Sequence, residues 1–296
     1  MLKPLKILIT GTNGFLGNHL LNYLSNFNYE LFSVTKSPLV NHQHILVKNF
    51  EGDLTNETFV KNTLDAVKPN VIIHCAAMSK PDDCENNQQL CWQTNVLSTK
   101  YLVENAQNYN AHFVFCSTDF VYGEGDNHNE NGTCNPLNYY AKSKLAAEQI
   151  ITSITPKFTI IRPVFIYGKE IKGVRKSFIQ WVKESLETSQ QIKVVNDQFR
   201  TPTHVIDICK ALETIVSTTT LGIFNLAGTE ILTPYQMAVI IANQLNLDDK
   251  LIIPVTEEDF KEPVKRAKRS ILCIEKAKEV LHFNPLTFSK AIAESF

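Results

Sequence analysis

The feature that most constrains the fold of this chain is the regular alternation of short apolar strand patterns with longer helical patterns. The expected strands are rich in β-branched and aromatic residues and cover 6–10, 31–35, 45–47, 71–74, 112–116 and 158–162. Helical segments separate them. A crossover helix returns the chain to the same edge of a sheet, so successive strands run parallel and helices cover both faces. The alternation therefore predicts a doubly wound, parallel α/β sheet.

The alternation weakens after about residue 162, which indicates a second, mixed region. A helix is expected near 174–188, a strand at 192–195, a helix near 203–217 and a strand at 223–227. The length of 296 residues is about twice that of a usual domain. We therefore predict one large domain over 1–165, to which 203–228 returns. A smaller mixed α/β region is expected over 166–202 and 229–296.

Composition excludes several classes of protein. Hydrophobic residues make up 44% of the chain, charged residues 20%, and the formal net charge is −1. A disordered chain has fewer apolar residues, and a nucleic-acid-binding protein is usually basic. No apolar run approaches the roughly 18 residues of a membrane-spanning helix. We expect a soluble, untargeted, cytoplasmic protein that binds neither nucleic acid nor membrane.

Cysteines and histidines show no metal or disulfide pattern. Seven cysteines without Cys-x-x-Cys spacing are typical of free thiols in a reducing compartment. His42 and His44 form a His-x-His pair, but no cysteine or acidic residue stands nearby at ligand spacing, so a solvated loop is expected and no metal site. A basic cluster at 265–269 predicts either a solvated turn or an anion contact.

A glycine-rich turn follows the first expected strand and opens an amphipathic helix. Gly11, Gly14 and Gly17 are spaced Gly-x-x-Gly-x-x-Gly. Glycines let the backbone approach a pyrophosphate, whose charge is favoured by the unpaired N–H groups at a helix N-terminus. A packing turn without a ligand is the alternative. In this strand-to-helix position a dinucleotide site is favoured, formed by the three glycines together with Asn13, Phe15 and Leu16.

The ends of the second and third strands carry further candidate cofactor contacts. An NAD site usually places Asp or Glu at the end of the second strand to bind the ribose hydroxyls, and no carboxylate stands there. Lys36 can instead receive a 2′-phosphate, so NADPH is expected over NADH or NAD, with a plain surface lysine as the alternative. Asp53, next to Leu54, can accept from an adenine amino group or cap the helix that begins near Asn56.

Tyr140 and Lys144 form the strongest catalytic pattern. They stand four residues apart and so share one face of an expected helix. An ammonium beside the phenol predicts a tyrosine pKa lowered from its ordinary value of about 10 toward the working pH, which makes a usable general acid. Ser117 and Thr118 at the end of a parallel strand, where such sheets bind ligands, support this interpretation.

Four motifs together resemble the extended short-chain dehydrogenase/reductase superfamily, which has a Rossmann dinucleotide-binding domain. They are Gly11-x-x-Gly14-x-x-Gly17, His74-Cys-Ala-Ala77, Ser117-Thr118-Asp119 and Pro136-x-Asn138-x-Tyr140-x-x-x-Lys144. The most similar branch is that of the dTDP-4-dehydrorhamnose reductases. The resemblance continues through 197–207 and 222–228. At 266–272 it is partial, because Ala267 replaces a proline that is usual in the branch.

The resemblance implies a role for each matched residue. Thr118 would hydrogen-bond a substrate carbonyl, Tyr140 would protonate its oxygen, and Lys144 would hold the nicotinamide ribose, while the cofactor supplies hydride. Ala76 and Ala77 would contact the cofactor. Asp119, Arg200 and Arg266 are the expected substrate contacts; for Asp119 a helix cap or loop role is an equal alternative.

The implied function is NADPH-dependent reduction of a keto group on a nucleotide-activated sugar. Dehydration is disfavoured because Phe120 stands where sugar-nucleotide dehydratases carry a glutamate, and phenylalanine is neither acid nor base. An NAD(P)-dependent epimerase stays open as the first alternative. A non-catalytic subunit that resembles the β subunit of methionine adenosyltransferase is the second. Relatives also imply a homodimer, in which the helix expected over 87–108 pairs with the Tyr140 helix; packing on its own sheet is the alternative.

Overall fold

The computed structural model describes residues 3–40, 46–260 and 264–296, and its centre is a seven-stranded parallel sheet. The strand order is β11-β7-β5-β4-β1-β2-β3. Their bounds are Leu5–Thr10 (β1), Tyr29–Thr35 (β2), Val47–Glu51 (β3), Val71–His74 (β4), His112–Cys116 (β5), Phe158–Pro163 (β7) and Gly222–Leu226 (β11). The order runs outward from β1 in both directions, so the predicted doubly wound fold is confirmed.

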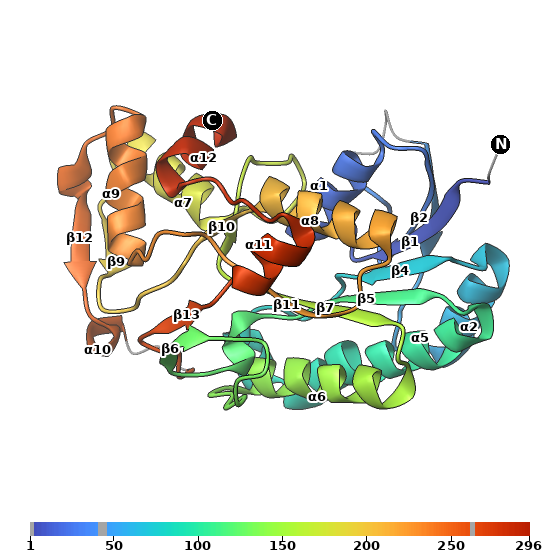
Figure 1. Ribbon diagram of the computed structural model, residues 1–296. Coiled ribbons are helices and arrows are strands. Elements are labelled where there is room, and N and C mark those ends of the chain that lie inside the picture. The colour runs from blue at the N-terminus through green and yellow to red at the C-terminus, as the bar shows by residue number, and fades with distance from the viewer. Residues whose placement is uncertain (1–2, 41–45, 261–263) are drawn as a thin grey trace.

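Helices cover both faces of this sheet (Figure 1). Each of the two layers has its own apolar core. One face carries α1 (Phe15–Leu24), α8 (Val205–Thr218) and α11 (Glu275–Leu281). The other carries α2 (Glu57–Val67), α5 (Ser98–Ala106) and α6 (Tyr139–Ile154). Central strands such as β4 and β5 are buried on both sides, which explains why their sequences are continuous apolar runs rather than alternating ones.

A second region lies beyond the sheet, on the left of Figure 1. It has an apolar cluster of its own, separate from the two cores of the sheet and called here the second cluster. It is formed by α7 (Phe178–Glu187), α9 (Pro234–Gln244) and α12 (Phe288–Ser295) with the parallel strands β9 (Ile192–Val195) and β12 (Ile252–Val255). The short helix α10 (Glu257–Phe260) follows β12. Capping boxes at Ser177 and Thr233 begin α7 and α9 by satisfying backbone N–H groups that have no partner within the helix.

Two short strand pairs connect distant parts of the chain. β6 (Gly125–His128) pairs with β13 (Ser270–Leu272), and β8 (Ile166–Tyr167) pairs with β10 (Thr203–His204). The helix predicted from about residue 203 begins two residues later, at Val205, because Thr203 and His204 extend beside β8. The third strand was predicted to end too early: it covers Val47–Glu51, whereas the predicted range 45–47 ends at Val47 and begins at a residue outside the described ones.

Between β4 and α6 the chain forms a series of short helices. They are α3 (Pro81–Asn86), α4 (Gln88–Trp92) and a π-helical segment, Gln93–Leu97, that leads into α5. A further 3₁₀ turn, Asp119–Val121, follows β5. His42 and His44 lie outside the described residues. Among the described residues, no group of histidine, cysteine, aspartate and glutamate side chains could hold a metal ion, and no helix is long and apolar enough to cross a membrane.

Candidate active site

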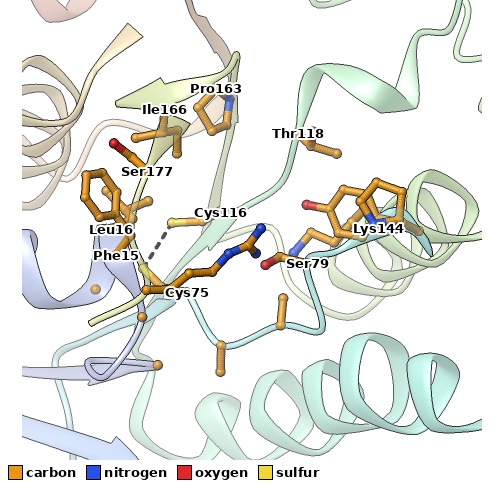
Figure 2. Close-up of a pocket in the computed structure, with 18 of the residues that line it drawn as sticks. Phe15, Leu16, Cys75, Ser79, Cys116, Thr118, Lys144, Pro163, Ile166 and Ser177 are labelled. Carbon is orange, nitrogen blue, oxygen red and sulfur yellow. Dashed lines mark hydrogen bonds between the residues drawn. The ribbon is translucent and has the colours of Figure 1, made fainter. Parts of the chain in front are cut away.

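The candidate active site is a cavity of about 910 Å³ along the carboxyl edge of the sheet. The turns that follow β1, β2, β3, β4, β5 and β7 all contribute to its wall, because the carboxyl ends of parallel strands meet at one edge. Figure 2 shows Phe15 and Leu16 on one side of this space, with Thr118 and Lys144 on the other. All the residues predicted to bind the cofactor line it, as do Asp119, Arg200 and Arg266.

The glycine turn is shaped by close backbone contacts. Gly11 has a φ of +74°, and a Cβ there would lie 2.6 Å from the backbone nitrogen of Ala76. A Cβ at Gly17 would overlap the carbonyl oxygen of Gly11. Gly14 has an ordinary extended backbone, and a Cβ there would approach only the Gly11 carbonyl oxygen, at 3.1 Å. Gly11 and Gly17 are therefore required by packing, whereas Gly14 leaves open space at the start of α1 for a ligand.

Asn13 holds the loop that follows β2 rather than extending freely into the cavity. Its side-chain amide donates to the carbonyl oxygen of Pro38 at 3.0 Å, and its Oδ1 accepts from the backbone N–H of Val40 at 3.0 Å. The same amide also donates to the Ser37 hydroxyl at 3.2 Å. Asn13 thus fixes the glycine turn against the end of β2, which carries Lys36.

A buried chain of hydrogen bonds through His74 positions the turn after β4. The Thr99 hydroxyl donates to the carbonyl oxygen of Asn95, so it must accept from Nε2–H of His74 at 3.0 Å. Nδ1 of His74 then accepts from the Thr10 hydroxyl at 2.7 Å, and Thr10 in turn accepts from the backbone N–H of Ala76. Burial lowers the pKa of His74 to about 3, so the ring is neutral, as this arrangement requires. The motif His74-Cys-Ala-Ala77 contains two members of this network, but the sequence did not indicate their hydrogen bonds to Thr10 and Thr99.

Lys36 forms an ion pair with Asp53, with 2.8 Å between Nζ and Oδ2. The other carboxylate oxygen of Asp53 accepts from the backbone N–H and the hydroxyl of Thr55. Partial burial raises the pKa of Asp53, but the Lys36 contact and the bonds from Thr55 outweigh it and leave the pKa below its ordinary value. Asn56, and not Asp53, caps α2. Two residues predicted separately as cofactor contacts are thus partners of each other.

Thr118 and Asp119 form a buried polar pair at the end of β5. The Thr118 hydroxyl donates to Oδ1 of Asp119 at 3.2 Å and accepts from the backbone N–H of Phe120. Burial raises the pKa of Asp119 to about 6, although the positive charge of Arg200 opposes the rise. The ring of Phe120 meets the ring of Tyr140 edge to face, with 6.1 Å between the centroids. Thr118 therefore lies within reach of the same part of the cavity as Tyr140.

Tyr140 and Lys144 share one face of α6, as the sequence predicts, but the expected effect on the tyrosine pKa is wrong. Burial raises the pKa of Tyr140 well above 10, and the nearby Asp119 carboxylate raises it further. Lys144 is also buried, with Nζ 3.9 Å from the centroid of the Phe115 ring, and burial lowers its pKa to about 8. Removal from water has the largest influence on the pKa of both groups, so near neutral pH the phenol is protonated.

Arg200 and Arg266, the expected substrate contacts, are engaged with protein groups. The Arg200 guanidinium is buried and donates to the carbonyl oxygens of Ala267 at 2.7 Å and Phe199 at 2.8 Å. Arg266 forms an ion pair with Asp82 of α3, at 3.2 Å. Both side chains line the cavity and also tie the chain around residue 267 to its wall.

Several residues of the site carry no sequence signal that we recognised. Asn95, in the π-helical segment, accepts from the backbone N–H of Met78 at 2.8 Å and donates to the Ser143 hydroxyl of α6 at 2.9 Å. A π-helical turn inside a helix is frequent at functional sites. Arg175 and Lys176, from the segment before α7, and Lys193, from β9, also line the cavity, and Lys176 is ion-paired with Glu184. Isolated lysines and arginines look like ordinary surface residues in a sequence, so only the fold reveals them.

The family model described as the RmlD substrate binding domain matches residues 5–296. The chain belongs to this family. A dTDP-4-dehydrorhamnose reductase of Aggregatibacter actinomycetemcomitans is 28% identical, covering 97% of each chain. The methionine adenosyltransferase 2 subunit beta of Danio rerio is 27% identical over 86% of this chain and 78% of that protein. The predicted resemblance to the dTDP-4-dehydrorhamnose reductase branch is thereby confirmed.

Solved structures of RmlD-type reductases have the same fold. A dTDP-4-dehydrorhamnose reductase from Bacillus anthracis in complex with NADP superposes with a TM-score of 0.88, at 25% identity and over 99% of each chain. An ortholog from Clostridium acetobutylicum gives a TM-score of 0.83 at 28% identity, over 98% of each chain. In this chain, the family's fold brings the cofactor-site candidates and the catalytic candidates to one cavity.

Proposed function

We propose that this member of the RmlD family is an NADPH-dependent reductase of a keto group on a nucleotide-activated sugar, of the dTDP-4-dehydrorhamnose reductase type. The observation that carries the proposal is the joint position of Thr118, Tyr140 and Lys144 in the cavity that the glycine turn also lines. The similarity to dTDP-4-dehydrorhamnose reductases, one of them bound to NADP, supports it.

The cavity fits a dinucleotide at the carboxyl ends of β1 to β4. Gly11 and Gly17 bring the turn close to the Ala76 backbone, and Gly14 leaves space beside the N–H groups of the first turn of α1. Lys36 is the cation available for a 2′-phosphate, and its exposed pairing with Asp53 is weak enough to be exchanged for a phosphate. The cofactor, when bound, supplies hydride to the substrate carbon.

Side chains of the protein would stabilise the negative charge that develops on the substrate's carbonyl oxygen. Tyr140 is a protonated phenol near neutral pH, which is the form that a reduction consumes, and it gives its proton to that oxygen. The Thr118 hydroxyl turns from Asp119 to the same oxygen as a second donor. Lys144 stands one helical turn behind Tyr140 and favours the phenolate that is left.

Substrate selection would lie in the second cluster. We propose that 1–165 with 203–228 hold the cofactor and that 166–202 with 229–296 select the substrate. The cavity supports this, because Arg175, Lys176 and Lys193 bring positive charge suited to the diphosphate of a nucleotide sugar. We propose substrate roles for Asp119, Arg200 and Arg266. The two arginines would act through the loop around residue 267, which they hold against the cavity wall.

The test is turnover by the purified chain alone. With NADPH and a nucleotide-linked 4-keto-6-deoxysugar, absorbance of NADPH should fall in step with formation of a 4-hydroxy product. Deuterium from labelled NADPH should appear at the reduced carbon. An epimer formed with catalytic NAD and no net cofactor consumption would replace reduction with epimerisation.

The similarity to methionine adenosyltransferase 2 subunit beta supports one alternative of a different class, a non-catalytic binding subunit. That function requires no turnover by this chain. A panel of keto sugars without any reduction, together with NADPH binding and recovery of a methionine adenosyltransferase in a pull-down, would establish it. The presence of all three proposed catalytic residues favours the reductase.

A homodimer and a cytoplasmic location complete the proposal. Leu90 and Trp92 on α4 are each 41% exposed and lie beside α6, within the segment 87–108 that the family resemblance implies for pairing with the Tyr140 helix. Light scattering of the purified chain should give twice its mass of 33.5 kDa, and a monomer would remove this part of the proposal.

A further inference from the structure

Two cysteines lie side by side in the wall of the cavity. Cys75 follows β4, Cys116 ends β5, and their sulfur atoms are 3.3 Å apart (Figure 2). Both residues line the cavity. Cys75 is partly exposed, and Cys116 is 8% exposed. Neither thiol has a part in the proposed reduction.

We propose that Cys75 and Cys116 are a redox modification site, which a peroxide converts to a reversible disulfide and which bound dinucleotide protects. The disulfide itself is independent of the proposed function. Only the protection rests on it, because a dinucleotide that occupies the glycine turn and reaches Tyr140 must pass over the turn after β4.

The backbone geometry suits a disulfide. His74 pairs with Phe115 in the parallel register, so the next residues, Cys75 and Cys116, stand directly across from each other. Neighbouring strands lie about 4.8 Å apart, and the Cα atoms of disulfides are usually about 4.4–6.8 Å apart. The sulfur atoms need to approach by only about 1.3 Å to reach the bond length of about 2.05 Å. Small side-chain rotations therefore suffice, without separation of the strands.

The reaction balances with one peroxide molecule. Cys75 is the more exposed residue of the two, so we assign the first step to it: its sulfur attacks a peroxide oxygen, the O–O bond breaks, a sulfenic acid forms, and water leaves. The Cys116 sulfur then attacks the sulfenic sulfur, the S–O bond breaks, and the thiol proton leaves with the hydroxyl group as a second water. The two sulfurs lose two electrons in total and the peroxide gains them. A dithiol restores both thiols by exchange.

A second close pair of cysteines provides an internal comparison. Cys84 and Cys91 pack together with Tyr140 in an apolar cluster, and both are 0% exposed. They do not line the cavity. A small oxidant in the cavity therefore reaches Cys75 but not these two. The hydrogen bond with Cys116 and burial raise the pKa of Cys75, so the thiolate is scarce and we expect oxidation to be slow at neutral pH.

The experiment treats the full chain with hydrogen peroxide, blocks the remaining thiols with N-ethylmaleimide, and maps the peptides by mass spectrometry. A peptide pair linked through Cys75 and Cys116 should form and disappear with dithiothreitol. Cys116→Ser should abolish it, whereas Cys273→Ser, which changes a partly exposed cysteine that does not line the cavity, should retain it. Cys75→Ala provides a second variant if Cys116→Ser does not fold. A disulfide at another pair, or only sulfinic acid at Cys75, would overturn the proposal.

Protection is measured separately from cofactor binding. NADPH affinity is first determined by fluorescence titration, and oxidation is then followed with saturating NADPH. Disulfide formation should slow by about tenfold or more, since few molecules have an empty cavity when NADPH is saturating. If NADPH does not bind, the proposed function fails, but a disulfide that peroxide forms in the absence of NADPH still supports the modification site. If NADPH binds and oxidation is not slowed, the protection is disproved.

Discussion

Burial decides the protonation state of the residues proposed to carry the chemistry. It raises the pKa of Tyr140, lowers the pKa of Lys144 to about 8 and raises the pKa of Asp119 to about 6. Each shift favours the neutral form of its group, as removal from water requires. In the window between about 6 and 8, the phenol is therefore protonated while Lys144 keeps its charge and Asp119 is ionised.

Replacing Tyr140 tests its role as proton donor. Tyr140→Phe keeps the ring against Phe120 but removes the hydroxyl, so reduction should slow by about 10²–10⁴. NADPH affinity should stay within about twofold, because ring packing is preserved. Single-turnover hydride transfer measures the first quantity and fluorescence titration the second. A rate of hydride transfer within about threefold of the parent rate would reject Tyr140 as the proton donor and make Asp119 the next candidate.

Asp119 should make stability depend on pH in a specific direction. Its folded-state pKa of about 6 lies above the ordinary 3.8, so the folded chain binds more protons than the unfolded chain between these values. The contribution of Asp119 to stability therefore falls as pH rises from about 4 to 6, by about 3 kcal/mol. Asp119→Asn should remove this loss, so its stability relative to the parent should increase over that range in urea unfolding. If stability depended on pH in the same way in both proteins, the raised pKa of the Asp119 carboxyl would be contradicted.

Lys36 and Asp53 should affect cofactor choice in opposite directions. Lys36→Ala removes the cation proposed for the 2′-phosphate, so the preference for NADPH over NADH should fall by about 5- to 20-fold. Asp53→Asn should increase the same preference, because it frees Lys36 and removes a negative charge from beside the phosphate. Titration of both cofactors into both variants measures this. Equal affinity of the parent for NADPH and NADH would reject the assignment.

At the scale of elements, the junction of β1 and α1 depends on glycines for two different reasons. Gly17→Ala places a methyl group on the Gly11 carbonyl, a rigid backbone contact, and should destabilise the fold by about 2–4 kcal/mol. Gly14→Ala has an allowed backbone conformation and should change stability by less than about 1 kcal/mol. Its methyl group should instead weaken NADPH binding. Thermal unfolding and cofactor titration separate the two effects; similar losses of stability would refute the distinction.

Elements with a strong local pattern were predictable, and elements made by long-range pairing were not. The sequence predicts β4 and β5 at their observed bounds, because each is a buried apolar run. The edge strand β3 has only partly buried and exposed residues, so its apolar pattern is weaker and its bounds were predicted wrongly. β6, with the sequence Gly-Asp-Asn-His, has no strand propensity and forms only because β13 pairs with it from far along the chain.

At the scale of the whole molecule, the sequence predicts which residues line the cavity better than what they contact. The motifs identify the glycine turn, Lys36, Tyr140 and Lys144 because each motif lies within a few neighbouring residues. Partners far apart in sequence carry no such signal. The Asn95 bond to Ser143 and the burial that raises the Tyr140 pKa both depend on how α6 packs against other elements.

A buried ion pair joins strand β7 to helix α6. Arg162 of β7 contacts Glu148 of α6 at 2.5 Å and also donates to the Tyr122 hydroxyl, which donates to Asn225 of β11. Arg162→Met alone should destabilise the protein by about 3–5 kcal/mol, because Glu148 is left buried without its partner. The double variant Arg162→Met/Glu148→Leu should lose less. Urea unfolding measures both; a double variant as unstable as the single one would show that packing, not charge, is lost.

The order of the strands also has a consequence for synthesis on the ribosome. The face covered by α2, α5 and α6 has all its helices once residue 154 has emerged, and the strand β7 follows directly. The opposite face must wait for α8, β11 and α11, the last of which ends at Leu281. Between residues 154 and 281, more than a third of the chain, this side of the nascent sheet is covered first by α1 alone and then by α1 and α8. Because part of its apolar surface stays exposed, we expect aggregation to compete most with folding at this stage.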